Sequence, residues 1–100
     1  MTTAVEVSQT EVRLVAEGPL YSLDASEFEE KLESTLLMRF ATVTLDLSKA
    51  TAICSDSIGK ILFVRKKLAD QGRSFRIQGC GEKVLATFKM MQLDQLLEIQ

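Results

Sequence analysis

Residues 43–59 read Val-Thr-Leu-Asp-Leu-Ser-Lys-Ala-Thr-Ala-Ile-Cys-Ser-Asp-Ser-Ile-Gly, and this stretch decides the fold. Residues 43–47 alternate in the way of a strand, and their β-branched and leucine side chains are typical of a buried position in a sheet. The segment 52–57 then leads into a helix, which Gly72 ends as a left-handed C-cap. Apolar residues recur on one face of that helix, at Ile58, Ile61, Leu62, Leu68 and Ala69.

The segments on either side of this unit supply the remaining elements. Alternating residues predict two antiparallel strands at 5–7 and 12–16, joined by a turn from Ser8 to Glu11. A helix capped by Asp24 or Ser26 follows and runs to about Met38. The rest of the chain predicts a strand at Phe75 and Ile77, a helix from Glu82 to Met91 and a short strand over Leu96 to Ile99.

The order β-β-α-β-α-β-α-β, with short connections, predicts an α/β fold. We expect a mixed sheet of four to five strands with its helices mainly on one side. The first strand pair is expected to be antiparallel, and the later strands are expected to be parallel because helices connect them.

Composition limits the possible partners. The 100 residues contain a single proline and no linker-like stretch, so residues 1–100 are expected to form one domain. The 14 acidic and 12 basic residues form no long block, which argues against nucleic acid as a partner because phosphate binding needs a basic footprint. The sequence shows neither a signal peptide nor an apolar run of membrane-spanning length, and we therefore expect a cytoplasmic protein with no membrane partner.

A search for catalytic chemistry indicates that the chain is not an enzyme. Histidine, the commonest general base, is absent from the sequence. Gly79-Cys80-Gly81 lacks the third glycine of a dinucleotide fingerprint, and Val84 occupies that place, so a tight turn before a helix is the favoured interpretation. Cys54 and Cys80 lack metal-ligand spacing and are expected to remain reduced thiols. No cofactor or metal is predicted.

Several features in matching order resemble the STAS domain of bacterial anti-sigma factor antagonists. The strand Leu45-Asp46-Leu47 matches the family's apolar-x-Leu-Asp-Leu strand, and the loop after it opens a helix, as the family's Asp-Ser-Ser/Thr-Gly loop does. The other features are Gly18-Pro19-Leu20, Ala25, the helix-ending Gly72 and the closing segment from Met91 to Leu97. The resemblance covers nearly the whole chain and implies a single STAS-like domain.

The loop can be aligned with the family in two ways. Local identity places Asp56-Ser57-Ile58-Gly59 over Asp-Ser-Ser-Gly and makes Ser57 the phosphorylatable serine. Counting from the strand and from Gly72 instead places Ser55 at that position, with Cys54 in place of the preceding aspartate. We favour Ser55, because the other alignment shortens a packed helix by about half a turn. From the residues alone, Ser55, Asp56 and Ser57 are all good N-cap residues.

The resemblance implies a regulatory module that docks to a serine kinase/anti-sigma factor and is switched by phosphorylation of Ser55, with Ser57 as the alternative. Docking would use Cys54, Asp56, Ser57, Ile58, Gly59 and Phe63. Phe63 and Val64 either contact the partner or pack within the domain. A non-phosphorylated STAS scaffold or a ligand- or nucleotide-sensing module is the alternative function. We expect a monomer or a weak homodimer.

Overall fold

The computed structural model describes residues 3–97 and residue 99. The predicted α/β fold is confirmed, with the order β-β-α-β-α-β-α. Its elements are β1 (Thr3–Val7), β2 (Glu11–Leu20), α1 (Ser22–Ser34), the 3-10 helix η1 (Thr35–Leu37), β3 (Thr42–Ile53), α2 (Ser55–Asp70), β4 (Ser74–Cys80) and α3 (Glu82–Met90). The final strand predicted over 96–99 is wrong for Leu96 and Leu97, which lie in a turn, and residue 98 is outside the described residues.

The four strands form one sheet in the order β1-β2-β3-β4. β1 is antiparallel to β2, whereas β2, β3 and β4 run parallel, as the sequence predicted. Ser8 closes the hairpin between β1 and β2: its hydroxyl donates to the Glu11 carbonyl at 3.2 Å and accepts the Glu11 N–H at 3.1 Å. The parallel strands end at the same end of the sheet, and each leads there into a helix.

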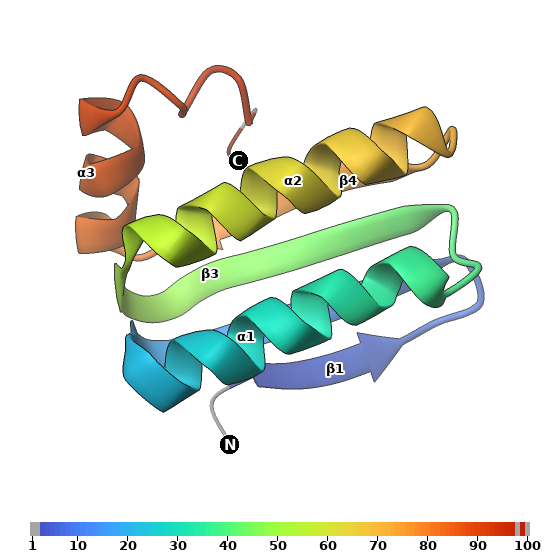
Figure 1. Ribbon diagram of the computed structural model, residues 1–100, viewed down its shortest axis with the longest axis horizontal. Helices are drawn as coiled ribbons and strands as arrows, with labels where there is room; N and C mark the ends of the chain where they lie inside the picture. Colours follow the sequence, from blue (N-terminus) through green and yellow to red (C-terminus); the bar gives the residue numbers. More distant parts are fainter. Residues whose placement is uncertain (1–2, 98, 100) are drawn as a thin grey trace.

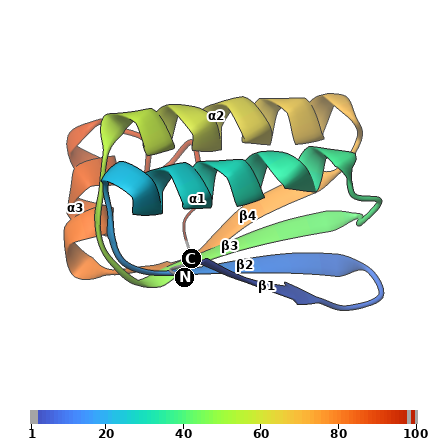
Figure 2. The same cartoon turned by 60° about the horizontal axis from the view of Figure 1, so that its bottom comes forward.

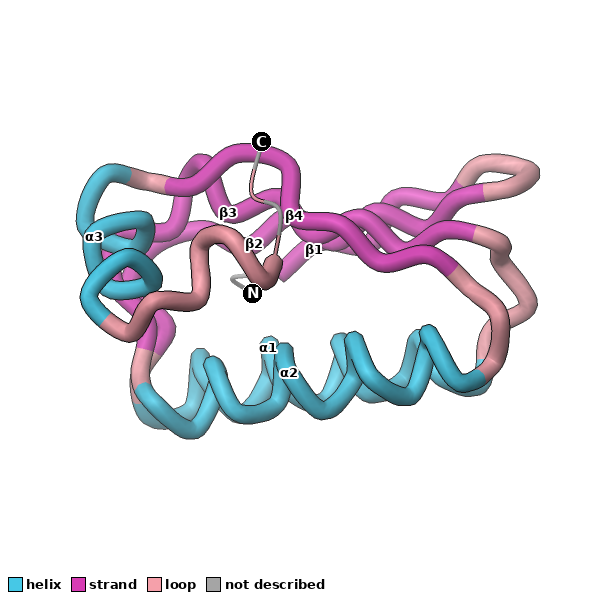
Figure 3. The backbone as a smooth tube through the Cα atoms, turned by 90° about the horizontal axis from the view of Figure 1, so that it is seen from above, coloured by secondary structure: helices cyan, strands magenta, loops and turns pink. Residues whose placement is uncertain are grey.

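Helices α1 and α2 form a layer on one face of the sheet. Helices α1 and α2 lie side by side along that face, with their N-termini at the same end (Figures 1 and 2). Helix α3 stands at the carboxyl end of the parallel strands, beside the N-termini of α1 and α2 (Figure 3). None of the helices in the described part of the chain is long and apolar enough to cross a membrane.

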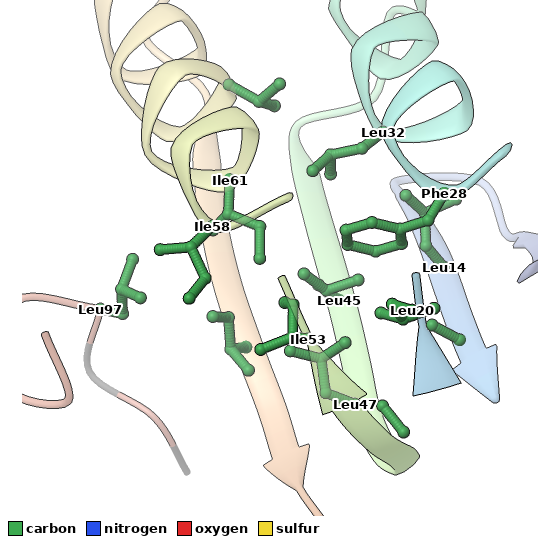
Figure 4. Packing of buried hydrophobic residues seen from close by; sticks show 14 of the residues in the cluster. Leu14, Leu20, Phe28, Leu32, Leu45, Leu47, Ile53, Ile58, Ile61 and Leu97 are labelled. Atoms are coloured by element: carbon green, nitrogen blue, oxygen red, sulfur yellow. The ribbon is translucent and has the colours of Figure 1, made fainter. Parts of the chain in front are cut away.

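The core fills the space between the sheet and this helical layer. Phe28 and Leu32 of α1 and Ile58 and Ile61 of α2 point toward Leu45 on the central strand β3 (Figure 4). These five side chains are at most 2% exposed. The apolar face predicted for α2 is largely right. Two of its predicted members are less buried than expected: Leu62 is only partly buried and Ala69 is exposed. Val64, which was not among the predicted members of this face, is buried in the core.

The C-terminal end of α2 is built as predicted. Gly72 has φ of +72°, the left-handed conformation that glycine adopts without strain. Its N–H donates to the Ala69 carbonyl at 3.0 Å, and the N–H of Arg73 donates to the Leu68 carbonyl at 2.9 Å. These two bonds make a Schellman motif, which satisfies carbonyls that the helix itself leaves free.

The cap predicted for α1 is wrong. The N-cap residue is Tyr21, which makes no side-chain capping bond, and both Asp24 and Ser26 lie inside the helix. The Ser26 hydroxyl donates back to the Ser22 carbonyl at 3.3 Å instead of receiving a backbone N–H. The helix also ends at Ser34, before the predicted Met38, because the last residues tighten into η1.

The glycines near residue 80 serve the backbone. Gly79 has φ of +80° where β4 carries an extra residue opposite β3. Gly81 follows as the N-cap residue of α3, and a Cβ placed on it would lie 2.1 Å from the Ala50 carbonyl oxygen. Close packing of β3 against this turn therefore requires glycine at position 81.

Candidate functional site

The site that the sequence singled out is the first turn of α2. Cys54 is the N-cap residue, in extended conformation with φ of −94° and ψ of 163°, and its carbonyl accepts the Ile58 N–H at 3.1 Å. No side chain caps the helix, so the prediction that Ser55, Asp56 or Ser57 accepts a backbone N–H here is wrong. The three residues occupy the first three positions within the helix, and their side chains are available for other contacts.

The two serines of this turn lie in opposite environments. Ser55 is exposed, as is Asp56 beside it, whereas Ser57 is fully buried. The Ser57 hydroxyl donates to Glu29 Oε2 on α1 at 3.0 Å and accepts from the Cys54 thiol, whose Sγ lies 3.5 Å away. Ser57 therefore joins α1 to α2, a tertiary contact in place of the predicted cap.

This difference decides which hydroxyl is open to chemistry. A phosphoryl group adds about −1.5 to −2 charges at neutral pH. On Ser57 that charge would lie in a buried space beside the Glu29 carboxylate, and it would break the bond between the two helices. On Ser55 it would lie in solvent at a helix N-terminus, where the helix dipole favours negative charge.

Four exposed residues of α2 line up along its outer surface. Gly59 follows Ser55 by four residues and Asp56 by three, and Phe63 follows Gly59 by four, which places them on one side of the helix. We call them the docking strip. Gly59 adds no side chain to the strip, and a Cβ placed there would meet no atom within 4 Å, so packing within the domain does not require glycine at this position. Phe63 is 46% exposed.

The other predicted contact residues lie elsewhere. Ile58 and Val64 are buried in the core, and Ser57 is buried against α1, so none of the three presents its side chain to a partner. Cys54 is half-buried at the edge of the strip. The interpretation of Val64 as a packing residue is the correct one. The predicted set is thus divided between an exposed strip and the core beneath it.

Basic side chains surround Phe63. The ammonium groups of Lys60 and Lys67 lie 5.5 Å and 5.6 Å from the centre of its ring, within the range of a cation–π interaction. On the other side of Lys60, a shallow groove of about 570 Å³ runs along α1. Its lining includes Glu30, Glu33, Leu36 and Leu37, and Lys60 forms a salt bridge with Glu33 across it.

Comparison with known proteins identifies the family. The model of the family described as "Mlab, STAS domain" matches residues 3–98. The chain belongs to the STAS domain family. The resemblance inferred from residues 43–59 is therefore confirmed. No curated protein sequence matches this STAS domain significantly.

Solved structures share its fold at low sequence identity. An anti-sigma factor antagonist from Mycobacterium paratuberculosis superposes with a TM-score of 0.86 at 17% identity, covering 98% of this chain and 83% of its own. SpoIIAA, an anti-sigma factor antagonist, matches in its unphosphorylated form with a TM-score of 0.81 at 14% identity (98% and 87% covered). Phosphorylated SpoIIAA from Bacillus gives 0.74 at 13% identity (98% and 90%). At these identities the likeness shows the fold.

The opposite face of the STAS sheet carries a polar network that the sequence reading missed. Asp46 on β3 is 8% exposed and accepts hydrogen bonds from the Ser48 N–H at 2.9 Å and the Ser48 hydroxyl at 2.6 Å. Arg13 on β2 forms a salt bridge with its other carboxylate oxygen. Burial opposes ionisation, but the bonds from Ser48 and Arg13 outweigh it and hold the pKa of Asp46 below its usual value. The carboxylate therefore ties β2 to β3.

The two cysteines of the STAS domain, Cys54 and Cys80, are not joined in a disulfide. Burial, with a further contribution from the charge of Asp46, raises the pKa of Cys80 to about 11, so this thiol stays protonated at neutral pH. Among residues 3–97 and 99, no cluster of acidic or cysteine side chains is arranged to hold a metal ion.

Sequence reasoning also missed Glu29. Its bond to Ser57 depends on how α1 and α2 pack, which the sequence alone does not give. The sequence offered one clue to this contact. Ser57 directly precedes Ile58, which lies on the buried face of α2, so the Ser57 side chain lies at the edge of that face.

Proposed function

We propose that this STAS domain is a regulatory protein-binding module of the anti-sigma factor antagonist type, acting in the cytoplasm and not as an enzyme. It docks to a serine kinase/anti-sigma factor through the docking strip, and phosphorylation of Ser55 ends that contact. The observation that carries the proposal is the contrast in the first turn of α2. Ser55 is exposed on the strip, while the competing hydroxyl of Ser57 is buried against Glu29.

The switch follows from the position of Ser55 on the strip. A phosphate there stands beside Asp56 and adds negative charge to a surface that otherwise has no side chain at Gly59 and an apolar one at Phe63. A partner that packs on this surface would have to bury the new charge, which is costly without a matching cation. The fold itself loses no bond, since no hydrogen bond among the described residues uses the Ser55 side chain.

The test measures binding of purified variants to the kinase-type partner captured from the native cytosol. We expect Ser55→Asp to weaken the complex on the order of tenfold or more, whereas Ser55→Ala binds as the wild type does. Ser74→Asp is the matched control, because Ser74 is exposed at the start of β4 and lies off the docking strip. Equal binding by Ser55→Asp and the wild type would refute the switch.

A second candidate function is a STAS scaffold that binds its partner without phosphorylation. The observation that favours it is Cys54, which supplies a thiol where the family has a carboxylate before the phosphorylated serine. This candidate predicts a stable complex that ATP leaves unmodified and that Ser55→Asp leaves unchanged. A ligand- or nucleotide-sensing role would instead show as amide shifts near Gly81 on addition of nucleotides.

A further inference from the structure

The groove along α1 described above lies on the uncovered side of the helical layer. Its volume is about 570 Å³, and no other element of the described chain lies over the outer side of α1 (Figures 2 and 3). Four of its lining residues are exposed: Ser26, Glu30 and Glu33 on α1, and Leu37 at the end of η1. Successive members are four, three and four residues apart, which aligns them along one side of the helix.

The groove carries more negative charge than the domain itself compensates. Its lining contains three carboxylates, those of Glu29, Glu30 and Glu33, and one ammonium group, that of Lys60. Lys60 pairs with Oε2 of Glu33. Glu29 accepts a hydrogen bond from the Ser57 hydroxyl but forms no salt bridge among the described residues, and Glu30 takes part in neither kind of contact there. The groove is therefore complementary to a positively charged partner.

The end of the groove near η1 is apolar. Leu36 is partly buried against the core, whereas the adjacent Leu37 is 90% exposed. Leu37 therefore contributes little to the packing of the domain, and its burial against another molecule would be favourable. An occupant that matches the groove has an apolar side chain at this end and cations nearer the middle of α1.

These features favour a basic amphipathic helix over other occupants. The groove is shallow, whereas a small molecule usually binds in a cleft that encloses most of its surface. Nucleic acids and anionic membranes would be repelled by the carboxylates. A helix lying along α1 can present one large apolar side chain and two cations one and two turns away from it, at the spacing of Leu37, Glu33 and Glu30. Arginine suits the cationic positions, because a guanidinium group can bind a carboxylate through two parallel hydrogen bonds.

We propose that the α1 groove binds a basic amphipathic helix of another protein. An apolar side chain of that helix packs against Leu36 and Leu37, and its arginines pair with Glu33 and Glu30. The mode is that of a helix laid into a groove of complementary charge. The proposal goes beyond the proposed function and does not depend on it, since no lining residue of the groove belongs to the docking strip.

The test uses a synthetic helical peptide as the probe. The peptide has about 18 residues, a length at which an alanine-rich sequence forms a helix. On a background of alanine and glutamine it carries leucine, arginine, arginine and leucine at positions i, i+4, i+7 and i+11, which matches Leu37, Glu33 and Glu30 in either direction along α1. We expect the amide signals of these three residues to shift on titration, and the binding to weaken as salt is added. A control peptide with glutamate in place of both arginines is expected not to bind.

Two single substitutions test the two halves of the groove. Glu30→Lys is expected to weaken binding of the arginine peptide roughly threefold to tenfold, because a cation then faces the arginines. Glu82→Lys is the matched control, since Glu82 is also an exposed helical glutamate but lies on α3. Leu37→Ser is expected to weaken binding by about threefold or more, because the apolar contact is lost. Its control is Met90→Ser, which removes another apolar side chain, 81% exposed, at the end of α3.

All four substituted side chains are exposed, so each variant is expected to keep the fold, which circular dichroism checks. Absence of binding by the arginine peptide at millimolar concentration overturns the proposal. So does equal binding by the glutamate peptide, or equal weakening by the groove variants and their controls. Shifts in the groove when the chain alone is concentrated would assign it to a second copy and overturn the proposal as well. No kinase-type partner enters these measurements, so their failure leaves the proposed function untouched.

Discussion

The middle of β3 and the first turn of α2 are joined within one short stretch of chain, yet their side chains are held in different ways. Leu45 is buried in the core, and Asp46 is bonded on the opposite face of the sheet to Ser48 and Arg13. Seven residues after Leu47, Cys54 starts a helix that no side chain caps, and Ser55 is exposed at its first position. The side chains of the strand are therefore held by contacts within the fold, whereas the exposed side chains at the start of the helix are accessible to other molecules.

This comparison predicts that substitutions in β3 change stability, whereas substitution of Ser55 changes binding. Ser57 combines features of both regions, because it lies in the first turn of α2 but its side chain is buried.

Leu45→Ala should cause the largest loss. It removes a fully buried side chain from the central strand and leaves a cavity facing α1 and α2, which costs about 2–5 kcal/mol. Chemical denaturation gives the free energy of unfolding directly. A loss below about 1 kcal/mol would contradict the burial of Leu45, since core truncations of this kind cost more.

Asp46→Asn should cost less, about 1–3 kcal/mol, because it weakens the hydrogen bonds that the carboxylate accepts and removes its ion pair with Arg13. Since the folded state lowers the pKa of Asp46, its stabilising contribution is present above the unfolded pKa of about 3.9. That contribution is lost as the pH falls through the lower folded value. Unfolding measured against pH should therefore show a smaller acid-induced loss for Asp46→Asn than for the wild type, and parallel curves would contradict this role.

Ser57→Ala tests whether Ser57 contributes to stability although it lies in the first turn of α2. It removes the bond to Glu29, and we expect a loss of about 0.5–1.5 kcal/mol. The half-buried Glu29 carboxylate can turn to water, which keeps the loss modest. Ser55→Ala, the matched control two residues earlier, should change stability by no more than about 0.5 kcal/mol, as exposed substitutions usually do. Equal effects of the two substitutions would remove the distinction between these serines.

The sequence predicted the elements that are defined by local periodicity. The alternation at 43–47 and the apolar face of α2 were enough to place the central strand, the helix beside it and the parallel pairing. It missed the second half of β3, because residues 48–52 are small or polar and this part of the strand pairs with β2 through two irregularities in the ladder. The final strand was predicted from apolar residues near Leu97, but that side chain enters the core from a turn.

For the candidate site, distance along the chain and local identity selected different serines. Counting from the strand and from Gly72 selected Ser55, which the structure shows to be exposed. Capping preferences pointed to all three polar residues of the loop and failed for each, because residue preferences do not contain the tertiary bond from Ser57 to Glu29. Contacts between helices that are distant in sequence, like the network around Asp46, required the structure.

The most direct test of the central claim is to map the phosphorylation site. The wild-type chain is incubated with the captured kinase-type partner and ATP, digested and analysed by tandem mass spectrometry, with Ser55→Ala and Ser57→Ala treated in parallel. The account predicts phosphate on Ser55 in the wild type and in Ser57→Ala, and none in Ser55→Ala. Phosphate on Ser57 in the wild type, retained in Ser55→Ala, would contradict it, because the buried hydroxyl bonded to Glu29 would then be the one that reacts.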